Sequence, residues 1–147
     1  MAVFCREHRI TLLTYGTLLG GLLSEKYLGS PEPPRAELNT ASLQKYKHMI
    51  DAWGGWTLFQ ELLAALKQIA DKHWVSVANV GIRYILDRPS VAGVIVGARL
   101  GVAQHIADNA QVFGFELDTG DHTAIETVLA KSRDLIKLIG DCGDEYR

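Results

Sequence analysis

The sequence predicts an α/β fold in which two parallel strands are joined by crossover helices. One observation is a pair of short β-prone segments, residues 10–15 and 91–96, each followed by glycine. Another is the helical periodicity of the chain between them, because parallel strands need a long crossover connection, usually a helix. The 147 residues, of which 48% are hydrophobic, suffice for one domain with its own core. We therefore treat residues 1–147 as a single domain.

The chain opens with residues 3–8, which suit the last turns of a helix, and then enters the first β-prone segment. That segment, residues 10–15, is apolar and ends in a glycine-rich exit that contains Gly16 and Gly20. Residues 29–34 follow, with prolines at three of the last four positions. Proline cannot continue a helix or join a central strand, so this stretch is predicted to be a loop.

Helical spacing and capping residues predict three helices between the strands. Gly54 is of the type that ends a helix, and Thr57 and Ser76 are of the type that starts one. Pro89 stops the last of the three just before the second strand. We expect the two later helices to cross on one side of the sheet. The three helices are placed at about residues 40–53, 58–72 and 77–86.

The second strand leads into a turn bracketed by Gly97 and Gly101, then into a helix at residues 102–109. The helix is expected to turn an apolar stripe formed by Val102, Ile106 and Ala110 toward the core. A helix N-terminus favours an anion, and Arg99 would add a formal positive charge. The same joint is common in α/β proteins, so this pattern leaves the presence of a ligand open. A last helix is predicted at about residues 121–132, followed by a loosely held tail.

The composition excludes several classes of function. A formal charge of -2 and a pI near 6.2, with no basic cluster, argue against a nucleic-acid partner. No apolar run approaches the length that spans a membrane. Cys5 and Cys142 lack the spacing of a disulfide framework or a zinc site, so no metal is expected. We expect a protein of a reducing compartment, the cytoplasm.

Both glycine exits, in this order, resemble the C-terminal part of an aldo-keto reductase. The family is a (β/α)8 TIM barrel that uses a nicotinamide cofactor, usually NADP(H). Residues 10–15 resemble its seventh strand and residues 91–96 its eighth, so the predicted fold is a partial barrel with a helical tail. The motifs that carry the resemblance are Tyr15-Gly-Thr-Leu18, Gly20-Gly-Leu-Leu23, Glu25-Lys-Tyr27 and Gly97-Ala-Arg99, followed by Gln104, His105, Asp108 and Asn109.

The resemblance implies a role for each residue of the first exit. Tyr15 would stack on the nicotinamide, and Lys26 would neutralise phosphate charge. Gly16 and Thr17 stand where the family has Ser-Pro, which leaves the hydrogen bond of that serine hydroxyl open. The residues implied to lie along the pyrophosphate are Gly16, Thr17, Leu18 and Gly20.

The second exit is implied to bind the adenosine end. Arg99, with the backbone near Gly97, would hold the 2′-phosphate. The turn is about two residues longer than the common form, so either Gln104 or His105 faces the phosphate, and His105 is preferred. The residues implied to hold the adenine are Asp108 and Asn109.

In this family a tyrosine donates the proton, helped by Lys, Asp and His, and all four lie on early barrel strands. No segment here resembles those strands. The resemblance therefore implies the C-terminal, cofactor-binding portion of an NADP(H)-dependent reductase of aldehydes and ketones, inactive alone. Open sheet edges favour pairing with the missing N-terminal barrel part or self-association. The alternative is a non-enzymatic module, derived from that barrel, that binds nucleotide or offers only an interaction surface.

Overall fold

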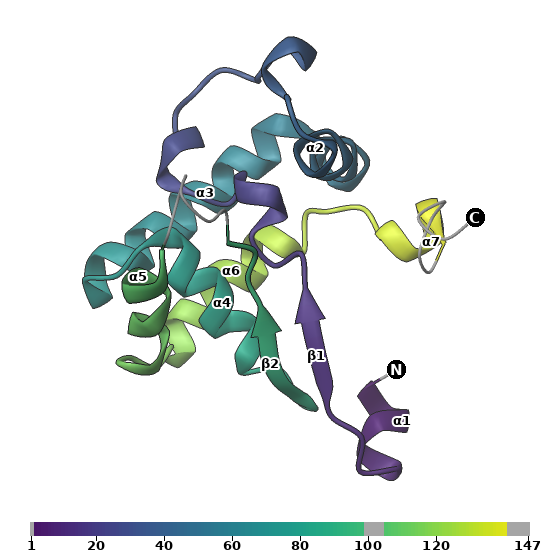
Figure 1. The fold of residues 1–147 in the computed structure, drawn as a ribbon, viewed down its shortest axis with the longest axis vertical. Helices are drawn as coiled ribbons and strands as arrows, with labels where there is room; N and C mark the ends of the chain where they lie inside the picture. Colours follow the sequence, from purple (N-terminus) through teal and green to yellow (C-terminus); the bar gives the residue numbers. More distant parts are fainter. Residues whose placement is uncertain (1, 99–104, 141–147) are drawn as a thin grey trace.

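A computed structural model describes residues 2–98 and 105–140, and Figure 1 shows the two strands side by side with their arrowheads at the same edge. Strands β1 (Leu12–Tyr15) and β2 (Val91–Ile95) pair in parallel, with Tyr15 opposite Ile95. The prediction of adjacent parallel strands is confirmed, although each strand is slightly shorter than expected. Their carboxyl ends, which precede Gly16 and Gly97, leave the sheet together.

Helices fill the connection between the strands and continue after β2 (Figure 1). Helix α4 packs on β2, and α3 packs on both α4 and α6. No described helix is long and apolar enough to cross a membrane. The helices are α1 (Ala2–Glu7), α2 (Ala41–Trp53), α3 (Gly55–His73), α4 (Val77–Leu86), α5 (Ile106–Ala110), α6 (Thr119–Leu129) and α7 (Leu135–Ile139), with short 3-10 turns η1 (Leu19–Gly21), η2 (Glu25–Tyr27), η3 (Arg35–Glu37) and η4 (Gln111–Phe113).

The core lies between the helices and the turns after β1. Phe59 and Leu63 of α3 are almost fully buried, as are Val80 of α4, Ile125 of α6 and Leu22 after η1. Burial of large side chains of this kind is the main stabilising contribution to a domain of this size. The helical layer is therefore held together by contacts that involve little of the sheet.

One face of the sheet carries large exposed apolar side chains. Leu13 is 66% exposed, Tyr15 57% and Ile95 56%. These residues alternate along their strands with less exposed neighbours, as expected when one face of a sheet is covered and the other is not. The uncovered face is a surface on which further structure can pack.

The cap predicted at Ser76 is confirmed, because its hydroxyl accepts a hydrogen bond from the Asn79 amide at 3.2 Å. The cap predicted at Thr57 is wrong. Helix α3 begins at Gly55, whose φ of +84° turns the chain directly out of α2, so Thr57 already lies in the first turn. Gln60 instead holds the loop around Tyr27, with its side-chain amide donating to that carbonyl at 2.9 Å.

The predicted apolar stripe of the helix after β2 is also wrong. Ile106 is 69% exposed, and Ala110 is exposed as well. The inward side of α5 carries Asp108, whose carboxylate accepts a hydrogen bond from Ser76 Oγ at 3.0 Å. A polar anchor to the N-terminus of α4 therefore decides how α5 is oriented. Val102, the remaining member of the stripe, lies outside the described residues.

Helix α6 starts with a reciprocal capping box between Asp118 and Asp121. Lys72 of α3 donates to both carboxylates, at 2.5 Å and 2.8 Å, and His73 lies 2.7 Å from Asp121. The hydrogen bond from Lys72, with the backbone amide of Asp121, lowers the pKa of Asp118 to about 2. These contacts fasten the end of α3 to the start of α6.

The residue that ends α3 is Trp74, in the left-handed conformation with φ of +59°. Its amide bonds back to the last turn of the helix, and the amide of Val75 donates to Ala70 at 3.0 Å. Glycine is the usual residue at such a position because it has no Cβ to crowd the following carbonyl. The indole is 90% exposed, so the strain is not compensated by burial.

Candidate functional site

The exit of β1 forms a tight turn that begins at Gly16. Gly16 has φ of +78°, and its carbonyl accepts the amide of Leu19 at 2.9 Å. Within the described part of the chain, the amides of Thr17 and Leu18 donate to no partner. Successive free amides beside a left-handed residue make a concave group of donors suited to an anion. This turn can therefore hold a phosphate.

The exit of β2 leaves the sheet beside this turn, since Tyr15 and Ile95 are paired partners. Gly97 is exposed, and a side chain added there would meet nothing. Open space beside a glycine allows a ligand to approach the backbone closely. Arg99 and Gln104 lie outside the described residues, so their predicted contacts with the 2′-phosphate stay predictions.

Lys26 lies in η2, on the same connection but after the turn. Its ammonium is 5.1 Å from the centre of the Tyr27 ring, and the side chain is exposed. The preceding residue, Glu25, accepts the amide of Val77 at 2.6 Å, which fixes this segment to the N-terminus of α4. The position of Lys26 is thus determined by α4, while its role toward a phosphate stays a prediction.

The N-terminus of α4 also anchors α5, which carries Asp108, one of the residues predicted to hold the adenine. Ser76 donates to the Asp108 carboxylate, and Asn79 Nδ2 donates to the Asp108 carbonyl at 3.0 Å. Asn79 is fully buried, and its Oδ1 has no hydrogen-bond partner among residues 2–98 and 105–140. His105 precedes α5 as its N-cap, is exposed, and makes no side-chain cap bond. One helix terminus therefore holds the segments that follow both strands.

This arrangement involves residues that sequence reasoning missed. Ser76 was predicted only as a cap, and Asn79 was not singled out. Their contacts with Asp108 join positions about 30 residues apart, at 32 and 29 residues of separation. No local pattern reports a contact over that distance. The candidate residues that the structure brings to one edge are Tyr15, Gly16, Thr17, Leu18 and Gly97. Asp108 is held by the same helix terminus as Glu25, and Asn109 follows it in α5.

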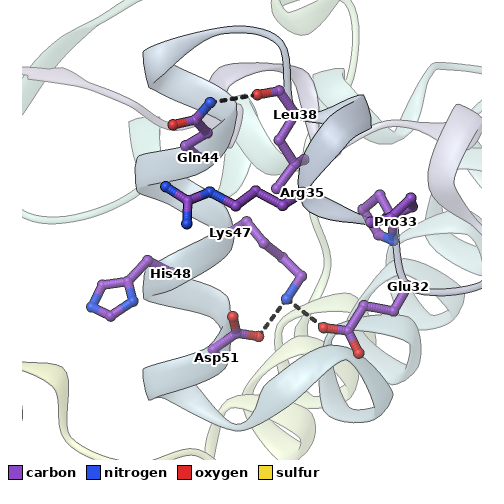
Figure 2. A pocket seen from close by; sticks show the side chains of 9 residues that line it. Glu32, Pro33, Arg35, Leu38, Gln44, Lys47, His48 and Asp51 are labelled. Atoms are coloured by element: carbon purple, nitrogen blue, oxygen red, sulfur yellow. Dashed lines mark hydrogen bonds and ion pairs between the residues drawn. The ribbon is translucent and has the colours of Figure 1, made fainter.

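A separate cavity of about 730 Å³ lies between the proline-rich loop and α2. Figure 2 shows Lys47 pointing between Asp51 and Glu32, with ion pairs of 2.6 Å and 2.5 Å. Burial alone would lower the pKa of Lys47, but its hydrogen bonds to the two carboxylates raise it. None of the predicted cofactor residues lines this cavity. Lys47 there fastens the loop to α2.

The architecture is that of an α/β protein, a class in which ligands bind at the carboxyl ends of parallel strands. The family model of the aldo/keto reductases matches residues 1–130, and the chain belongs to this family. Its described sheet corresponds to part of a TIM barrel.

Curated relatives are similar over much of the chain. Dihydrodiol dehydrogenase 3 of Bos taurus is 31% identical over 143 residues, which are 97% of this chain and 35% of that protein. Prostaglandin F synthase 2 of Bos taurus is 32% identical over 130 residues, or 88% of this chain and 31% of that protein. Flagellar radial spoke protein 5 of Chlamydomonas reinhardtii is 40% identical over 85 residues, or 56% of this chain and 16% of that protein.

A solved structure agrees in fold. The glycerol dehydrogenase of Gluconobacter oxydans superposes with a TM-score of 0.63 at 23% identity, covering 89% of this chain and 37% of that one. The chain thus spans between a sixth and about a third of the length of these relatives.

Proposed function

We propose that this chain forms the nucleotide-binding half-site of an NADP(H)-dependent aldo-keto reductase that reduces aldehydes or ketones. The observation that carries the proposal is the common edge where β1 and β2 end. There the amides of Thr17 and Leu18, which have no partner in the described part of the chain, offer donors for a phosphate, and Gly97 leaves room for one. Tyr15, at the end of β1, supplies an aromatic ring on which a nicotinamide could stack.

In this proposal each strand exit binds a different part of the cofactor. Gly16, Thr17, Leu18 and Gly20 lie along the pyrophosphate, with Lys26 neutralising charge. The second exit takes the adenosine 2′-phosphate and the adenine, through Arg99, His105 or Gln104, Asp108 and Asn109. The cofactor supplies the hydride when it is bound. The residues of this chain bind and orient it.

The proton donor and the substrate pocket are proposed to come from further barrel strands. The uncovered sheet face, with Leu13, Tyr15 and Ile95 exposed, supports packing against such strands. An exposed apolar patch of this kind marks an interaction surface. Additional polypeptide with the early strands is the partner we propose, and a second copy of this chain is the other candidate. We propose the cytoplasm as the compartment, since the spacing of Cys5 and Cys142 is not that of a disulfide framework.

Calorimetric titration of the chain with NADPH and NADH tests the proposal. We expect NADPH to bind more tightly, with weak affinity because the loops must be ordered on binding. An aldehyde should not be reduced by the chain alone, and adding a separately made N-terminal part of a family member should restore turnover. Failure to bind either cofactor would favour the interaction module. NADPH-dependent turnover by the chain alone would show that it holds its own proton donor.

A further inference from the structure

We propose that Tyr46 is a further cofactor-binding residue, whose hydroxyl takes the place of the side chain that Gly16 lacks and donates a hydrogen bond to the pyrophosphate. This inference rests on the proposed function, since it adds a contact to the same site. Tyr46 lies on α2, 30 positions after Gly16 in the numbering. Nothing in the sequence pattern around either residue indicates that they meet.

The geometry that supports this proposal is the contact between α2 and the turn after β1. A Cβ added to Gly16 would overlap the Tyr46 hydroxyl and lie 3.0 Å from Cζ of the ring. A Cβ added to Gly20 would lie 3.2 Å from Cδ2 of the same ring. The ring therefore runs along the turn from Gly20 to Gly16, with its hydroxyl at the β1 end.

The positive φ of Gly16 explains why a side chain is not supplied locally. At φ of +78° any residue with a Cβ is strained, so a hydroxyl cannot readily be carried by residue 16 itself. A tyrosine that reaches in from α2 places an oxygen beside the Gly16 backbone, where a side chain of residue 16 would begin, without that strain. The chain thus combines the backbone freedom of glycine with a hydroxyl at the strand exit.

The hydroxyl is available for a ligand. No residue in the described part of the chain forms a hydrogen bond with Tyr46 Oη. Among the described residues, Asn79 Oδ1 is the buried polar side-chain atom without a partner, so Tyr46 Oη is not buried. It stands beside the turn whose Thr17 and Leu18 amides are also without a described partner. A phenol and two amides at one turn are hydrogen-bond donors, and the oxygens of a pyrophosphate can accept from them.

The Tyr46→Phe variant tests the proposal, because it removes the oxygen and keeps the ring that packs on Gly20. NADPH contains the pyrophosphate, whereas adenosine 2′-monophosphate carries the 2′-phosphate without it. We expect calorimetric titration to show roughly tenfold weaker NADPH binding, as for the loss of a hydrogen bond to a charged group. Binding of adenosine 2′-monophosphate should be unchanged. Tyr84→Phe is the control, since Tyr84 is a half-buried tyrosine of α4 that packs against Arg88. This variant should leave both affinities unchanged.

Thermal unfolding followed by circular dichroism accompanies each titration and should be unaltered by Tyr46→Phe. Equal NADPH affinity in wild type and Tyr46→Phe, or tighter binding in the variant, would overturn the inference and leave the proposed function standing. Equal weakening for both ligands would show that Tyr46 acts only on the shape of the site, which also overturns it. If the wild-type chain binds neither ligand, the proposed function falls and this inference falls with it.

Discussion

Replacing Trp74 by glycine should stabilise the protein, although the change deletes the largest of all side chains. The residue has φ of +59°, and a left-handed conformation costs an L-residue roughly 1–2 kcal/mol. Its indole is 90% exposed, so its removal forfeits little buried area. Glycine is more flexible when unfolded, so its greater loss of entropy on folding lowers the free energy of unfolding by roughly 0.5–1 kcal/mol and offsets part of that gain. The net expectation is an increase of about 0.5–1 kcal/mol in the free energy of unfolding.

Urea unfolding followed by circular dichroism at about 222 nm, a helix band, measures this change without relying on tryptophan fluorescence. Trp74→Ala is the matched control, because alanine loses the indole but keeps a Cβ in the strained conformation. It should remain within about 0.5 kcal/mol of wild type, as is usual for exposed positions. The reasoning is refuted if Trp74→Gly is no more stable than Trp74→Ala.

Further expectations concern acid stability, a second glycine and cofactor choice. The Asp118 pKa is about 2 in the folded chain against 3.8 ordinarily. The stability that Asp118 contributes through Lys72 is therefore present above about pH 4 and lost as the pH falls toward 2. Asp118→Asn should flatten the pH dependence of the free energy of unfolding, measured by urea melts, over that range. Gly20→Ala should lower the free energy of unfolding by about 1–2 kcal/mol, since Gly20 has φ of +66° and its added Cβ would lie 3.1 Å from Ser42, and a melting temperature equal to wild type would contradict this. Arg99→Ala, assayed in the complete enzyme, should weaken NADPH binding by roughly 1.5–3 kcal/mol and NADH binding much less, and equal losses would show that Arg99 does not contact the 2′-phosphate.

Local patterns predicted the elements of this chain better than the contacts between them. The strands and the Ser76 cap depend on neighbouring residues, so β-prone apolar runs, glycine exits and capping preference were sufficient. Thr57 was assigned as a cap because its residue type suits one, but Gly55 allows α3 to start earlier with no linker. That outcome depends on backbone geometry at consecutive glycines, which residue preferences do not report.

The candidate site divides in the same way. The turn after β1 was predicted, since glycines at a strand exit indicate a turn regardless of the rest of the fold, whereas its binding of a phosphate stays a prediction. The inward side of α5 was not, because a hydrogen bond from Ser76 to Asp108 outweighs the apolar pattern that includes Ile106. The meeting of Tyr46 with Gly16 depends on how α2 packs against the turn, which only the tertiary structure determines.

The pairing of β1 with β2 also has a kinetic consequence. Thr14 Oγ1 donates to the Gly93 carbonyl at 3.3 Å across 79 positions of sequence, and the helical core lies between them. Closing so long a loop is slow unless intervening structure brings its ends together. Helices α2 to α4 should therefore form first, and β1 should join β2 late in folding. In hydrogen exchange, the amides of β1 should lose protection before those of α3, so the turn proposed to bind phosphate would follow a segment that opens before the helical core.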